Sequence, residues 1–141
     1  MRDLKTATER LKGSGDSLVL VKKGRILLSR QDGGIRPLFN AVTDLGEEMR
    51  GSCVADKVIG KAAAALCIFG GVSGIYTPVI SRAAAELLAE NGIVYSADLF
   101  VTGILNRDKS DLCPLERLTA DTNNWMDIVE IVREFIYRPS E

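Results

Sequence analysis

The sequence predicts one domain over residues 1–141 with an α/β fold, a three-layer α/β/α sandwich around a mixed β-sheet. Two β-rich runs on either side of a short glycine-containing turn predict an antiparallel hairpin near the N-terminus. Further along the chain, strand patterns alternate with helix patterns, as they do in parallel strands joined by right-handed crossovers. The order of the elements therefore places an antiparallel pair on one side of the sheet, parallel strands on the other, and helices on both faces.

The first third of the chain supplies two helices and the hairpin. Leu4, Ala7 and Leu11 recur at helical spacing, so the first helix lies at the N-terminus. Gly24 can adopt the positive φ of the hairpin turn, and Gly46 ends the second helix. The expected elements are a helix at 2–12, strands at 17–21 and 25–29, and a helix at 37–45.

The middle of the chain supplies two strand–helix units. An alanine-rich run favours the first of the two helices, which two consecutive glycines at 70 and 71 end. Ser81 is expected to cap the second helix through its hydroxyl group. The expected elements are a strand at 53–59, a helix at 61–69, a strand at 72–79 and a helix at 81–90.

The last third is less regular. Residues 93–95 and 99–105 predict one broken strand or two short ones, because Asp98 does not suit a wholly buried strand. Pro114 begins a short helix, and the final helix is amphipathic. Its apolar face comprises Trp125, Ile128, Val129, Val132, Phe135 and Ile136.

Composition excludes several classes of function. The chain has 18 Lys and Arg residues against 19 Asp and Glu, a net charge of −1, which argues against general binding of DNA or RNA. It has no histidine, so a Ser-His-Asp triad, a Cys-His pair and a His-ligated zinc site are excluded. We therefore expect no metal site, no cofactor and no zinc-dependent deaminase activity.

Cysteine usage and apolar runs predict a cytoplasmic protein. The three cysteines, Cys53, Cys67 and Cys113, form no close pair and fit neither a disulfide framework nor a thiolate metal site. The N-terminal residues are too highly charged for a signal peptide. Residues 62–81 lack charges, but their glycines and Pro78 predict a helix, a turn and a buried strand in place of a membrane span.

The two strand–helix junctions are the first candidate site. Adjacent parallel strands bring the starts of both following helices to one edge of the sheet, where free amides and helix dipoles favour an anion. Lys57 and Lys61 add positive charge at the first junction, and Arg82 adds it beside Ser81 at the second. Alternatively, these cations are ordinary surface groups that pair with carboxylates such as Asp56 or Glu86.

Cys113-Pro114-Leu115-Glu116 is the second candidate site. A thiol at a helix start has a lowered pKa if it is exposed there, and Glu116 lies one turn further on. Alternatively, Cys113 is half-buried and unreactive, with Glu116 a favourable carboxylate in the first helical turn. Cys53 and Cys67 are expected in the core.

The order of elements and the residues at the two junctions resemble the cytidine-deaminase-like fold. Enzymes of that fold place a zinc-binding His or Cys and a catalytic Glu at the first helix start, and Pro-Cys-x-x-Cys at the second. Here residues 56–64 contain none of these three residue types, and Val79 and Arg82 replace the two thiolates after Pro78. The sequence is similar to an uncharacterised bacterial and archaeal family of this fold that lacks the zinc ligands. The similar segments are Asp56-Lys57, Gly60-Lys61, Ser81, Asn106-Arg107 and Cys113-Pro114-x-Glu116.

Three functions follow as hypotheses. The first is a zinc-less deaminase-like domain that binds a small anion, such as a nucleotide or phosphate. Its ligand-binding residues would be Lys57, Gly60, Lys61, Ser81, Arg82, Asn106 and Arg107.

The second hypothesis is an enzyme with Cys113 as nucleophile, in which Lys57 or Lys61 lowers the thiol pKa. In that enzyme Asp56 or Glu116 would transfer protons. The third is a structural or regulatory module that forms a homo-oligomer through the final helix, with Trp125, Phe135 and Tyr137 as contacts.

Overall fold

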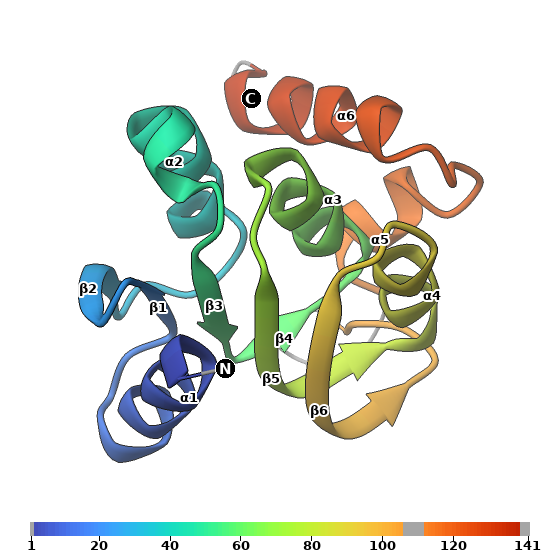
Figure 1. Ribbon diagram of the computed structural model, residues 1–141. Coiled ribbons are helices and arrows are strands. Elements are labelled where there is room, and N and C mark those ends of the chain that lie inside the picture. Colours follow the sequence, from blue (N-terminus) through green and yellow to red (C-terminus); the bar gives the residue numbers. More distant parts are fainter. Residues whose placement is uncertain (1, 106–111, 139–141) are drawn as a thin grey trace.

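The computed structural model describes residues 2–105 and 112–138, which form a mixed α/β fold (Figure 1). Most element boundaries lie within two residues of the sequence-based expectation. The helices are α1 (Arg2–Gly13), α2 (Arg36–Leu45), η1 (Gly46–Met49, a 3₁₀ helix), α3 (Lys61–Gly70), α4 (Arg82–Glu90), α5 (Pro114–Leu118) and α6 (Trp125–Tyr137). The strands are β1 (Leu18–Lys22), β2 (Arg25–Arg30), β3 (Cys53–Asp56), β4 (Val58–Ile59), β5 (Gly74–Ser81) and β6 (Val94–Val101).

The six strands form one mixed sheet. β2 pairs with β1 and β1 with β3, both antiparallel, whereas β3, β4 and β6 all pair with β5 in parallel. The hairpin turn contains Lys23 and Gly24, both with positive φ, which confirms the expected role of the glycine. The mixed α/β class and the division into an antiparallel and a parallel side are thus confirmed.

The strands of the parallel side bend at one level of the sheet. β3 and β4 pair with β5 in the same register, so they are one strand interrupted at Lys57. In β5 the bend is at Pro78, where the Thr77 hydroxyl donates to the Val79 carbonyl at 2.9 Å. Figure 1 shows β5 and β6 changing direction together. The continuous strand expected at 53–59 is therefore divided, because Pro78 has no N–H group to pair with it.

Helices cover the two faces unequally. Of the described helices, α1 is the one that packs on one face, against β1, β3 and β5, where Ala7 and Leu11 meet Tyr76 in a small apolar cluster. α2, α3 and α4 lie on the other face, and α6 packs over α3 (Figure 1). The main core lies between these helices and the sheet. None of the described helices is long and apolar enough to cross a membrane.

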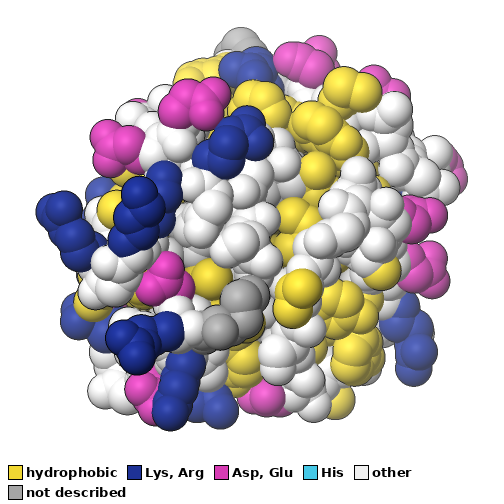
Figure 2. All heavy atoms as spheres, in the orientation of Figure 1, with side chains coloured by type: hydrophobic (Ala, Val, Ile, Leu, Met, Phe, Trp, Pro, Cys, Tyr) yellow, Lys and Arg dark blue, Asp and Glu magenta, His cyan; other side chains and the backbone are white. Residues whose placement is uncertain are grey.

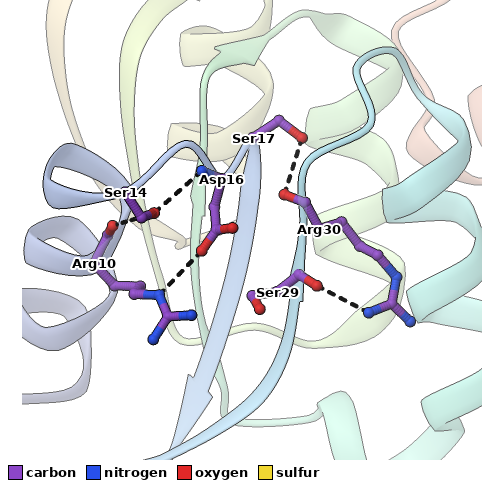
Figure 3. A network of polar contacts seen from close by, with 6 residues as sticks. All are labelled: Arg10, Ser14, Asp16, Ser17, Ser29 and Arg30. Atoms are coloured by element: carbon purple, nitrogen blue, oxygen red, sulfur yellow. Dashed lines mark hydrogen bonds and ion pairs between the residues drawn. The ribbon is translucent and has the colours of Figure 1, made fainter.

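A polar network ties the end of α1 to the start of β1 (Figure 3). The Asp16 carboxylate accepts a hydrogen bond from Arg10 Nε at 3.0 Å, and the Asp16 amide donates to Ser14 Oγ at 3.1 Å. Ser14 Oγ in turn donates to the Arg10 carbonyl at 2.7 Å. The hydrogen bond from Arg10 holds the pKa of Asp16 below its usual value.

β6 differs from the broken strand or two short strands that were expected, and its position accounts for Asp98. It is one continuous strand, not two short ones, and it pairs with β5 over its length. It is the last strand on this side of the sheet, and Asp98 is exposed there while its carboxylate accepts a 2.5 Å hydrogen bond from the Tyr76 hydroxyl. Burial and this hydrogen bond raise the pKa of Tyr76 to about 12. The acidic residue is tolerated because it lies at an exposed edge of the sheet, beside α1, and has a hydrogen-bond partner there.

Candidate functional site

A cavity of about 550 Å³ opens at the carboxyl end of β3 and β4. Among the described residues, its walls come from five parts of the chain: the start of β1, the loop into α2, the end of β3 with β4, the start of α3, and Ile104 and Leu105 together with the start of α5. The wall side chains are mostly apolar, among them Leu38, Ala62, Ala63 and Ile104. The position agrees with the general rule that ligands of α/β proteins bind outside the carboxyl ends of the strands, and the volume suits a small molecule.

Five of the residues expected to act in a site line this cavity. Asp56, Lys57 and Gly60 come from the first strand–helix junction, and Cys113 and Glu116 come from the second candidate motif. The two candidate sites, more than 50 residues apart in the sequence, thus lie in one cavity.

Glu116 fastens two other segments to α5. Its carboxylate accepts hydrogen bonds from the Lys61 amide at 3.3 Å and from the Ile104 amide at 3.0 Å. A Cβ atom at Gly60 would lie only 2.8 Å from Glu116 Oε1, so the glycine permits this close approach. The start of α3 therefore already holds a carboxylate of the same chain, at the place where an anionic ligand was expected.

Lys61 faces away from the cavity, contrary to its expected role as a ligand contact. Its side chain is only 5% exposed. The ammonium group donates to the carbonyls of Thr119 at 2.9 Å and Ala120 at 3.4 Å, which follow the last turn of α5. Together with Glu116 it makes a reciprocal clamp in which α5 caps the start of α3 and α3 caps the end of α5. No pattern in the sequence signals this pairing.

The second junction does not contribute to the cavity. Ser81 is fully buried, and its hydroxyl accepts a hydrogen bond from the Ala84 amide at 3.1 Å, which confirms the expected helix cap. Arg82 is exposed, and neither residue lines the cavity. Asn106 and Arg107 lie outside the described residues. The starts of two helices were expected to surround one ligand, but only the start of α3, and not that of α4, lines this cavity.

Asp56 is the acidic residue at the end of β3. It lies on the same face of the strand as Val54, toward α3, where it is near Cys67. Burial raises the pKa of Asp56 to about 7, although the amides of Val58 and Lys57 act in the opposite direction. Burial and the nearby Asp56 also raise the pKa of the Cys67 thiol. Among the described residues, no ion pair includes Asp56.

Cys113 is half-buried at the residue before α5. Its amide donates to the Ile104 carbonyl at 2.8 Å, which closes the cavity wall. Cys53 and Cys67 are buried in the core, as expected. Within residues 2–105 and 112–138, no three His, Cys, Asp or Glu side chains are grouped to hold a metal ion.

Most basic side chains of the N-terminal third lie away from this cavity. Figure 2 shows Lys and Arg side chains gathered over α1 and the β1–β2 hairpin, at the left of the view. These elements carry Arg2, Lys5, Arg10, Lys12, Lys22, Lys23, Arg25 and Arg30. α1 packs on the face of the sheet opposite the helices that wall the cavity, so these cations do not make the cavity basic.

The fold and the cavity define a class: a mixed α/β domain with an apolar-walled cavity at the ends of parallel strands. The family model of a domain of unknown function, TM1506 (DUF1893), matches residues 6–136. The chain belongs to this DUF1893 family. It is also similar to the crystal structure of a DUF1893 family protein, TM1506, from Thermotoga maritima, with 28% identity and a TM-score of 0.87. That match covers 95% of this chain and 90% of the Thermotoga chain. No curated protein matches the sequence.

Several wall residues could not be found from the sequence. Ile35 and Leu38 come from the start of α2, and Ile104 comes from the segment after β6. Each is an ordinary apolar residue that would be equally at home in the core. Only the folded arrangement shows that these side chains surround an opening.

Proposed function

We propose that this protein binds a small molecule in the cavity between the end of β3, the start of α3 and α5. The observation that carries the proposal is the convergence of Asp56, Lys57 and Cys113 on an apolar-walled space of about 550 Å³. Binding sites of this size commonly combine apolar walls with a few polar groups that orient the ligand. The ligand that we propose has an apolar ring system that lies between the walls and polar substituents that reach the three side chains.

We further infer that the domain is a zinc-less relative of the cytidine-deaminase-like fold. The strand order, with an antiparallel hairpin beside three parallel strands, supports this inference. The cavity opens at the start of α3, the junction at which enzymes of that fold hold a zinc ligand and the catalytic Glu. Gly60 and Lys61 occupy that junction here, so the inference carries no deaminase chemistry with it.

Cavity binding is tested by nuclear magnetic resonance with one- and two-ring fragments that are cationic, neutral or anionic. We expect some fragments to shift the amide signals of Gly60, Ala62 and Ile104. Ile35→Trp fills the cavity from the α2 side and Ala63→Leu from the α3 side, so both should abolish the shifts. Ala89→Leu, an exposed helical alanine outside the cavity, is the matched control. If the shifts persist in both Ile35→Trp and Ala63→Leu, and both variants are folded, the fragments bind elsewhere and the proposal is rejected.

The anionic-ligand hypothesis is tested within the same experiment. Lys57 is the basic residue among the described cavity residues, and it is exposed, so it would contact an anion at the opening. Phosphate and anionic fragments should then lose binding in Lys57→Ala, with Lys5→Ala as an exposed control. Lys61→Ala does not test this hypothesis, because that ammonium group binds the Thr119 carbonyl after α5.

A second candidate function is thiol chemistry at Cys113, favoured by its position in the same cavity as Asp56 and Lys57. Iodoacetamide should then label Cys113 faster than Cys53 and Cys67, which are buried. Exposure alone explains a faster rate, so the pH profile is decisive. An activated thiol should show half-maximal labelling below the usual pKa of about 8.5, and Lys57→Ala should move that midpoint upward. A midpoint at or above the usual value would reject this candidate.

A further inference from the structure

We propose that the ligand of this cavity is a small organic cation, whose amine, amidinium or guanidinium N–H groups bind the Asp56 carboxylate while its apolar body packs between α2, α3 and Ile104. This inference rests on the proposed function, and it names the chemical class of the ligand. It departs from the anion expected from the sequence. Three observations lead to it.

The first observation is the balance of charge around the cavity. The charged residues that line it, among those described, are Asp32, Asp56 and Glu116 on the acidic side and Lys57 on the basic side. Lys57 is exposed, so water screens its charge. Among the described residues no ion pair joins it to Asp56. Lys61, the second cation expected there, is bound to carbonyls of the Thr119 region.

The second observation is that the carboxylates differ in what they already bind. Both oxygens of Glu116 accept backbone amides, so this group is used in holding α5, Ile104 and α3 together. Asp56 accepts amides only from its own chain neighbours Lys57 and Val58, so it joins no distant segments. In the part of the chain that the structure describes it has no ion-pair partner, and no side chain donates a hydrogen bond to it. A half-buried carboxylate in this state has acceptor positions free for a ligand.

The third observation is the character of the walls. Leu38, Ala62, Ala63 and Ile104 offer apolar surface and no hydrogen-bond donors from their side chains. An anion entering here would lose its hydration without gaining donors, and it would approach the Asp56 carboxylate. A cation gains a charge-assisted hydrogen bond to Asp56, which can be bidentate for a planar amidinium or guanidinium group.

The test uses three compounds of nearly equal size and shape: benzamidine, benzamide and benzoate. Binding is measured by isothermal titration calorimetry at pH 8, and the site is located by amide shifts of Gly60 and Ile104. We expect benzamidine to bind at least about tenfold more tightly than the other two, as a charge-assisted hydrogen bond provides. Asp56→Asn should remove this preference and leave benzamide affinity unchanged. Asp44→Asn, an exposed acidic residue on α2, should change nothing.

Lys57→Met is an independent test of the cation inference, because an exposed lysine is not needed for folding. Loss of its positive charge should raise benzamidine affinity and lower any benzoate affinity. Equal binding of benzamide or benzoate in the cavity would overturn the cation inference while the proposed function stands. Benzamidine affinity that is unchanged in Asp56→Asn would also overturn it. If no compound shifts the cavity amides and the blocked variants Ile35→Trp and Ala63→Leu behave as wild type with all fragments, the proposed function itself fails.

Discussion

Lys61→Met is expected to lower the free energy of unfolding by about 2 kcal/mol, which corresponds to a fall in Tm of roughly 7 °C for a chain of this length. Methionine keeps most of the packing of the buried stem but cannot donate to the Thr119 and Ala120 carbonyls. The gain from no longer burying an ammonium group offsets part of the loss. Hydrogen bonds from a charged donor and the carbonyls left unpaired at the end of α5 outweigh that gain.

Thermal and urea unfolding of matched variants measure this effect. Lys61→Ala also removes the apolar stem and leaves a space, so it should cost more, about 4 kcal/mol. Lys5→Ala, an exposed lysine of α1, should change stability by less than about 0.5 kcal/mol. A Lys61→Met protein as stable as wild type would show that the contact with α5 contributes nothing net.

Asp56 is expected to make the protein less stable as the pH rises from about 4 to about 7. Burial raises the pKa of its carboxyl from 3.8 to about 7, so between these values the folded state binds a proton that the unfolded state does not. Stability then falls with rising pH, by up to about 1.4 kcal/mol per pH unit from this group. Above pH 7 the contribution is fully lost, because both states are ionised and the folded state carries the cost of the buried charge.

Asp56→Asn should flatten this dependence and, at pH 8, raise the free energy of unfolding by roughly 2 to 4 kcal/mol. Asp44→Asn is the exposed control. Asp16, the other described carboxyl group with a shifted pKa, does not interfere: its pKa is lowered, so its contribution is lost only as the pH falls below about 3.8. Urea unfolding at several pH values measures the slope. A wild-type slope that survives in Asp56→Asn would assign it to another group.

The sequence predicted those elements whose signals are local. Gly24 in the hairpin, Ser81 at the start of α4 and Gly46 after α2 each act within a few residues, and each does what its residue type favours. The strand with Asp98 was wrongly divided because a polar residue argues against burial, whereas an edge strand with a tyrosine partner tolerates it. That partner lies in another strand, 22 residues away.

The site was predictable only in part, for the same physical reason. Asp56, Lys57, Cys113 and Glu116 were selected by residue type and position, and the fold brings them to one cavity. The direction of the Lys61 side chain was not predictable, because a lysine at a helix start suits both an anion site and a contact with distant carbonyls. Its acceptors lie 58 and 59 residues further along the chain, and no local pattern connects them to Lys61. The hydrogen bonds that Glu116 accepts from the Lys61 and Ile104 amides were not predictable for the same reason.

The clamp between α3 and α5 also orders events during synthesis of the chain. All six strands are complete by Val101, whereas Glu116 and the carbonyls that bind Lys61 follow later. Since a chain emerging from the ribosome folds its N-terminal part first, the sheet can pair while the cavity still lacks one wall. Until α5 arrives, the Lys61 ammonium group and the start of α3 remain open to solvent. The last quarter of the nascent chain therefore completes the cavity against a sheet that is already paired.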